Sequence, residues 1–133
     1  MARLRHFAVA VRDLDRSAKF YKEVFGLEQV GREDLDIGSA IYLSDGVINL
    51  ALLKYQSSTG SGLENAKEFV GPHHFGFQVD DFEGVQRKIE EAGGTFFFDL
   101  GTDKDKKNFE RKFKDPDGII FDISRKGWIG TKD

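Results

Sequence analysis

The sequence predicts an α+β fold in which one unit, a strand followed by a helix and three further strands, occurs twice. The segments LRHFAVAVRD (4–13) and HHFGFQVDD (73–81) have the same form, a histidine followed by alternating apolar residues and an aspartate, with seven positions between histidine and aspartate in each. At the same offset, Gly26 in the first half meets Gly94 in the second. Similarity of this kind within one chain indicates a duplicated supersecondary unit.

The first unit begins with RHFAVAV (5–11), which alternates with the period of a strand. A helix follows, with Asp13 as its N-cap and Gly26 as its stop. Its expected buried face carries Leu14, Ala18, Tyr21 and Phe25. The remaining strands are expected near 27–33, 38–44 and 46–54, with a hairpin turn at Asp45-Gly46.

The second unit begins with the strand HFGFQV (74–79), and Gly93-Gly94 ends its helix. The apolar stripe of that helix comprises Phe82, Val85, Ile89 and Ala92. Its other strands are expected near 95–99, 107–114 and 118–125, and DPDG (115–118) forms a turn between the last two. We therefore expect one domain over 1–133, divided into module one (about 1–55), a linker (56–72), module two (about 73–125) and a tail (126–133).

The linker contains one further helical signal. SGLENAKEFV is expected to form a short helix, because Ser61 and Glu64 have the spacing of a capping box.

Composition excludes several classes of function. The 20 basic and 23 acidic residues give a net charge of −3, which argues against a dedicated nucleic-acid binder. No segment approaches the roughly 18 apolar residues that a membrane span requires, and the N-terminus lacks the pattern of a signal peptide. The chain has no cysteine, so thiolate chemistry is excluded. We expect a cytoplasmic protein with no nucleic-acid or membrane partner.

Alternation along the strands gathers polar residues on the face that points away from the helices. If the bulky residues of each strand pack on the helix of their own unit, the opposite face carries His6, Asn49, His74 and Asp122. Small residues flank them, namely Ala8, Ala10, Ala51 and Gly76. Polar groups among small neighbours indicate a cavity, because a packed core fills such a face with bulk.

Two imidazoles and one carboxylate form the ligand set of a metal site with open positions for substrate. The set in His6, His74 and Asp122 suits iron(II), manganese, nickel, cobalt or zinc, and sequence does not choose among them. The competing interpretation is structural: His6 as an ordinary hydrogen-bonded strand residue, and Asp122 as a solvated one.

Four other residues are candidates for contacts. In the basic run KDKKNFERKFK (104–114), Arg111 is the expected contact for an anionic substrate, the alternative being a solvated hairpin. Gln78 shares the face of His74 and is a second candidate for substrate binding. Tyr42 donates a hydrogen bond to substrate or simply packs. Trp128 covers a pocket or subunit contact, or packs the tail on the surface.

Three segments resemble the vicinal oxygen chelate superfamily, which includes glyoxalase I, extradiol dioxygenases and bleomycin-binding proteins. They are LRHFAVAVRDLDRSAKFYKEVFGLE, HHFGFQVDDFEGVQRKIEEAGG and FKDPDGIIFDI. The resemblance implies two βαβββ modules whose U-shaped sheets surround a central metal site. It places the family's metal ligands on His6, His74 and Asp122. Asp122 stands where the family usually has glutamate, and Asn49 where glyoxalase I has a catalytic carboxylate.

The resemblance implies a small metal-dependent enzyme that chelates neighbouring oxygens of a small substrate on a divalent ion, with dioxygenase-like or glyoxalase-like lyase or isomerase chemistry. Asn49 and Tyr42 are its candidate catalytic residues. The alternative is a metal-free protein of the bleomycin-resistance type that sequesters a small molecule. A homodimer is expected, because small relatives with two modules usually pair so that modules of different chains complete each site.

Overall fold

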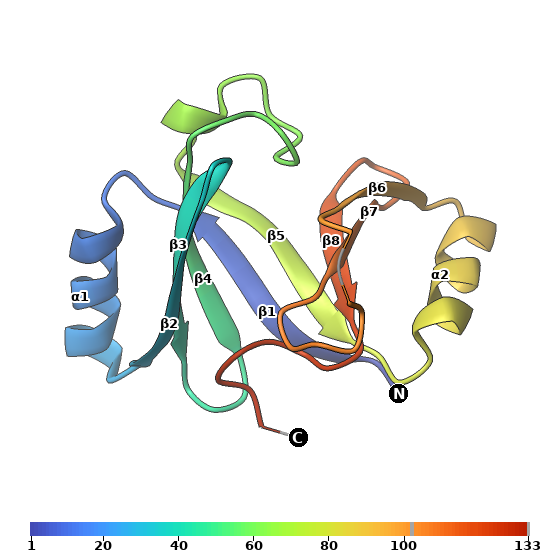
Figure 1. Cartoon of the computed structure of the whole chain (residues 1–133), viewed down its shortest axis with the longest axis horizontal. Helices are drawn as coiled ribbons and strands as arrows, with labels where there is room; N and C mark the ends of the chain where they lie inside the picture. Colours follow the sequence, from blue (N-terminus) through green and yellow to red (C-terminus); the bar gives the residue numbers. More distant parts are fainter. Residues whose placement is uncertain (102, 133) are drawn as a thin grey trace. The chain divides into compact units, whose positions relative to one another are not determined.

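The computed structural model describes residues 1–101 and 103–132, and its elements confirm the duplicated βαβββ order and the α+β class (Figure 1). The first repeat comprises β1 (Arg3–Ala10), α1 (Leu14–Phe25), β2 (Glu28–Leu35), β3 (Gly38–Ser44) and β4 (Asn49–Tyr55). The second comprises β5 (Gly71–Gln78), α2 (Phe82–Glu91), β6 (Thr95–Asp99), β7 (Arg111–Lys114) and β8 (Ile120–Ser124). No helix among these is long and apolar enough to cross a membrane.

The chain forms two compact units, and two of the three boundaries between them lie inside strands, one in β1 and one in β5. One unit combines Met1–His6 with His74–Trp128, and the other combines Phe7–His73 with the residues that follow Trp128. The strand order is β1-β5-β8-β7-β6 in the unit that contains His74, and β2-β3-β4-β1 in the other. The unit with His74 also contains His6 and Asp122, so all three predicted metal ligands belong to one compact unit.

Helix α1 begins and ends as the sequence predicts. The Asp13 side chain accepts a hydrogen bond from the Arg16 backbone N–H, and Gly26 ends the helix with φ +70°. The core of this unit joins one face of α1 to β3 and β4, through Val11, Leu14, Ala18, Ile41, Leu43 and Leu52. Tyr21 packs against this core, whereas Phe25 is 65% exposed, so the expected stripe is wrong for its last member.

The turn at Asp45-Gly46 is longer than the hairpin signal suggests. Ser44 pairs with Asn49, so four residues form the loop and β4 begins later than expected. Asp45 holds this loop, because its Oδ1 accepts from the backbone N–H groups of Val47 (2.9 Å) and Ile48 (2.8 Å). These donors also keep the pKa of Asp45 below its ordinary value.

The unit with His74 is arranged around β8. Strand β8 runs parallel to β5, with Asp122 beside Gly76, and antiparallel to β7, with Asp122 opposite Lys112. Helix α2 packs on the face of this sheet opposite to Asp122. The core between them comprises Val79, Phe82, Phe109, Phe113 and Ile123. Strand β7 is shorter than expected, because Asn108 adopts φ +65°, which an extended strand does not allow.

The expected linker helix is a short 3₁₀ helix, Ala66–Glu68, which begins after Asn65, and the last two linker residues already belong to β5. The capping box expected from Ser61 and Glu64 does not form. The Ser61 hydroxyl instead donates to the Ser58 carbonyl (2.8 Å) and accepts from the Leu63 N–H (3.1 Å), so it stabilises a turn before the helix.

Candidate metal centre

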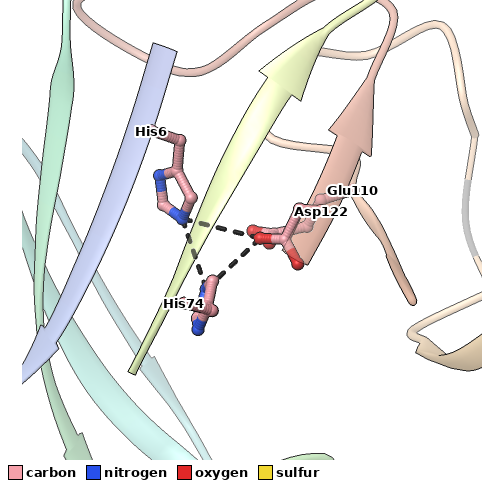
Figure 2. A group of neighbouring side chains, drawn as sticks. All are labelled: His6, His74, Glu110 and Asp122. Carbon is pink, nitrogen blue, oxygen red and sulfur yellow. Dashed lines mark hydrogen bonds and ion pairs between the residues drawn. The ribbon is translucent and has the colours of Figure 1, made fainter. Parts of the chain in front are cut away.

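Two of the three histidines meet inside one unit. His6 on β1 and His74 on β5 are both buried, and their Nε2 atoms lie 3.4 Å apart (Figure 2). Strands β1 and β5 are neighbours in the sheet, and residues that follow the same alternation in neighbouring strands lie on the same side. His6 and His74 therefore lie on one face. The similarity between the two histidine-led segments therefore has a structural consequence: it places two potential ligand nitrogens side by side.

Asp122 on β8 completes the group. Its Oδ2 lies 3.2 Å from His74 Nε2 and 3.6 Å from His6 Nε2, and its side chain is 0% exposed. This burial argues against the interpretation of Asp122 as a solvated strand residue. The shorter aspartate reaches the histidines because β8 pairs directly with β5, the strand that carries His74.

The spacing of these three atoms fits a divalent ion. Ligand atoms about 2.0–2.2 Å from a tetrahedral ion lie roughly 3.3–3.6 Å from one another, and the three separations are 3.2, 3.4 and 3.6 Å. Asp122 Oδ2, directed at both histidines, is buried with no hydrogen-bond partner among the described residues. A buried carboxylate oxygen that makes no hydrogen bond is costly, and a metal ion shared with the two histidine nitrogens beside it would offset that cost.

Two further charged residues, Glu110 and Lys112, adjoin this trio. The Lys112 Nζ lies 3.0 Å from Asp122 Oδ1, 3.0 Å from Glu110 Oε2 and 3.2 Å from His74 Nε2. Glu110 also offers a carboxylate oxygen within 4.8 Å of the ligand atoms of the three buried residues. We refer to His6, His74, Glu110 and Asp122 as the acidic cluster, and to Lys112 as its cation.

Glu110 and Lys112 were not among the residues predicted from the sequence. Both belong to the basic run that pointed to Arg111, and Lys112 lies opposite Asp122 in the β7–β8 pair. The alternation of β7 and β8 could have revealed Lys112, had the register of the two strands been known, because directly opposed residues share a face.

Burial and charge shift the titration of both groups. Burial raises the pKa of Glu110, and the negative charge of Asp122 raises it further, against the opposing effect of Lys112. Burial lowers the pKa of Lys112, but the charges of Asp122 and Glu110 outweigh that effect and leave it above the ordinary value. Lys112 therefore carries its positive charge at neutral pH.

Trp128 supports His6 from the other side. Its indole is fully buried and stacks on the imidazole, with ring centroids 4.7 Å apart and planes at 5°. Gly76 makes room for it: a Cβ at that position would lie 2.8 Å from two indole ring carbons. Gly76, expected from the sequence to border a cavity, thus leaves space for the Trp128 indole. Trp128 in turn orients the ring of His6, a candidate ligand.

The remaining candidates have contacts of their own. The Arg111 Nε donates to Asp99 Oδ2 on β6 (3.0 Å). Its guanidinium also contacts α2, where it donates to Gln86 Oε1 (2.6 Å) and lies over the Phe82 ring. Gln78 donates to the Arg125 carbonyl (3.3 Å). The roles of Arg111 and Gln78 in substrate binding stay predictions.

Asn49 and Tyr42 belong to the other unit. The Asn49 side chain is buried and donates to the Ile129 carbonyl (2.9 Å), and the Tyr42 hydroxyl donates to Glu33. The catalytic roles of Asn49 and Tyr42 stay predictions.

The third histidine has a different environment. His73 Nε2 lies 2.7 Å from the Ser61 carbonyl, and its Nδ1 lies 3.3 Å from the Tyr55 hydroxyl. An Nε2–H that donates to the carbonyl leaves Nδ1 to accept from tyrosine. His73 therefore connects the linker to the rest of its own unit, whereas the adjacent His74 is a member of the acidic cluster.

Known proteins share both the sequence pattern and the fold. The family described as "Glyoxalase/Bleomycin resistance protein/Dioxygenase superfamily" matches residues 3–123. The "Lactoylglutathione lyase GLX1" of Arabidopsis thaliana is 26% identical over 94% of this chain and 44% of its own length. A "Probable lactoylglutathione lyase" of Vibrio parahaemolyticus is 28% identical over 91% of this chain and 88% of its own length. The chain spans less than half the length of three plant relatives that it matches.

Among solved structures, a variant of the Streptomyces coelicolor methylmalonyl-CoA epimerase in complex with 2-nitronate-propionyl-CoA has a similar fold. The TM-score is 0.70 at 21% identity, and the match covers 92% of this chain and 96% of the epimerase. At this identity the similarity concerns the fold alone.

Proposed function

The chain belongs to the glyoxalase/bleomycin resistance protein/dioxygenase superfamily, and on this basis we propose that it is a small metal-dependent enzyme. The proposed ligands of its divalent ion are His6, His74 and Asp122, and its substrate is a small molecule with two neighbouring oxygens. The observation that carries the proposal is the convergence of the three buried ligand atoms, with separations of 3.2–3.6 Å.

Each residue has a distinct part in this proposal. His6 and His74 offer neutral nitrogens, and Asp122 offers the negative charge that a divalent ion requires. Trp128 fixes the plane of the His6 ring by stacking on it. When bound, the ion supplies Lewis-acid polarisation of substrate oxygens or, as iron, reactivity toward dioxygen. The relatives' names favour lyase chemistry, with isomerase or dioxygenase chemistry as the alternatives within the same proposal.

Adjacent histidines provide a matched test of the metal site. Wild-type protein, stripped of metal and titrated calorimetrically with Mn, Fe, Co, Ni and Zn, should bind close to one ion per chain. His74→Ala should lose at least about 100-fold in affinity, since it removes a direct ligand. His73→Ala should retain the wild-type affinity, because His73 contacts the linker. Equal losses in both variants, or none in either, would contradict the assignment.

A second candidate function is a metal-free binding protein that sequesters a small molecule. The observation that favours it is Lys112, whose ammonium already lies beside both carboxylates of the acidic cluster. The calorimetric titration separates the two candidates, because a protein that uses Lys112 as its only cation binds none of the five ions at micromolar concentration.

A homodimer is also part of the proposal, but a site shared between chains is not. Because one chain brings His6, His74 and Asp122 together, mixing His6→Ala with His74→Ala protein should restore no metal binding beyond the sum of the two.

The dimer itself is supported by three exposed apolar side chains on α1, namely Phe20, Val24 and Phe25. Light scattering at micromolar concentration should give twice the chain mass, and a monomeric mass would contradict the dimer.

A further inference from the structure

We propose that Lys112 is a built-in competitor of the metal ion: its ammonium occupies the acidic cluster in the metal-free protein, and a divalent ion binds only when the ammonium withdraws. This inference rests on the proposed function, because it concerns the same ligands. Beyond the proposed function, the inference assigns Lys112 a regulatory role, in which its own positive charge controls metal binding.

The contacts of Lys112 are those that an ion would need. An ammonium group donates hydrogen bonds and accepts none, so its 3.2 Å approach to His74 Nε2 uses the lone pair with which that nitrogen would bind a metal. Its 3.0 Å contact with Asp122 Oδ1 neutralises the carboxylate that would supply the ligand charge. Lys112 and the ion therefore compete for one nitrogen and one carboxylate.

The cation has a route out of the cluster. The side chains of His6, His74 and Asp122 are almost fully buried, whereas those of Lys112 and Glu110 are 15% and 25% exposed. Glu110 Oε2 also lies 3.0 Å from the ammonium and offers it a partner nearer to solvent. A long, flexible lysine can move outward with its apolar stem still covered, so its withdrawal leaves the three buried ligands in place.

Charge explains why the ion and the ammonium exclude one another. Inside a protein, the repulsion between a divalent ion and an ammonium a few ångströms away is far stronger than in water. Removal of the ammonium has opposite consequences in the two states of the protein. Without metal, Asp122 loses its cation and the fold is destabilised, whereas with metal the competitor is gone and the ion binds more tightly.

The test combines metal affinity with stability in the absence of metal. Lys112→Met and Lys112→Gln remove the charge, Lys112→Arg retains it, and Lys114→Met is the matched control. Lys114 lies on the same strand but places its Nζ over the Phe97 ring. Each protein is titrated with zinc and with nickel by calorimetry, and is melted in the presence of a chelator.

We expect the two neutral variants to bind the ions at least about tenfold more tightly than wild type. Lys112→Arg and Lys114→Met should stay within about twofold of it. In chelator, Lys112→Met should melt below wild type and below Lys114→Met, and added zinc should raise its melting temperature by more than that of wild type. If Lys112→Met does not fold, Lys112→Gln, which can still donate a hydrogen bond to Asp122, provides the same comparison.

Two results would overturn the inference, and they are distinguishable. Equal ion affinities in wild type and the neutral variants would show that Lys112 does not compete, while the metal site itself would stand. Absence of binding in wild type and in both neutral variants would overturn the proposed metal function and this inference with it.

Discussion

Replacement of Trp128 by alanine is expected to lower the free energy of unfolding by about 3–5 kcal/mol, the usual cost of truncating a fully buried large aromatic side chain. The indole is 0% exposed and fills the space above Gly76, so its removal leaves a cavity bordered by His6 and β5. Neighbouring strands are held by backbone hydrogen bonds and cannot collapse fully into such a cavity.

Chemical denaturation in the absence of metal measures this loss. Trp128→Phe is the matched variant, because it keeps an aromatic ring beside His6 and should lose less than half as much stability. A loss below about 1 kcal/mol for Trp128→Ala would contradict the packing described for the indole, since values of that size are typical of surface positions.

Substitution of Asp122 by asparagine is expected to weaken metal binding by at least about 100-fold, because it removes the negative charge that the buried trio contributes while keeping the shape of the side chain. Asp122→Glu retains the charge and should keep more affinity than Asp122→Asn, although the additional methylene must fit at a fully buried position. Calorimetric titration of the three proteins gives the comparison.

A suitable control is Asp105→Asn, since Asp105 is an exposed carboxylate whose partner is Arg125. It should bind metal as the wild type does. Identical dissociation constants for wild type, Asp122→Asn and Asp122→Glu would remove Asp122 from the site, and two histidines alone are too few protein ligands for a firmly held catalytic ion.

Local sequence signals are sufficient to predict the ends of an element where a single residue determines the backbone conformation. Helix α1 begins after Asp13 and ends at Gly26 as expected, because an N-cap oxygen and a left-handed glycine act within one turn of the helix. Strands β4 and β7 begin later than the apolar alternation predicts, for the converse reason. Asp45 organises a four-residue loop through its side chain, and Asn108 adopts a positive φ. The alternation of apolar residues predicts neither of these backbone conformations.

The same contrast applies to the candidate site. Alternation alone predicts that His6, His74 and Asp122 share one face, because each lies in a strand whose bulky residues define the opposite face. Lys112 and Trp128 could not be placed in that way. Lys112 depends on the register between β7 and β8, and Trp128 follows the last strand, where no periodic pattern constrains the direction of the side chain.

Anomalous X-ray diffraction from crystals grown with zinc or manganese would show whether His6, His74 and Asp122 together hold one divalent ion. We expect a single anomalous peak within about 2.0–2.3 Å of His6 Nε2, His74 Nε2 and an Asp122 carboxylate oxygen, with the Lys112 ammonium displaced from His74. Crystals that contain the metal but show no peak among these three side chains, with Lys112 still beside Asp122, would contradict the proposed metal site.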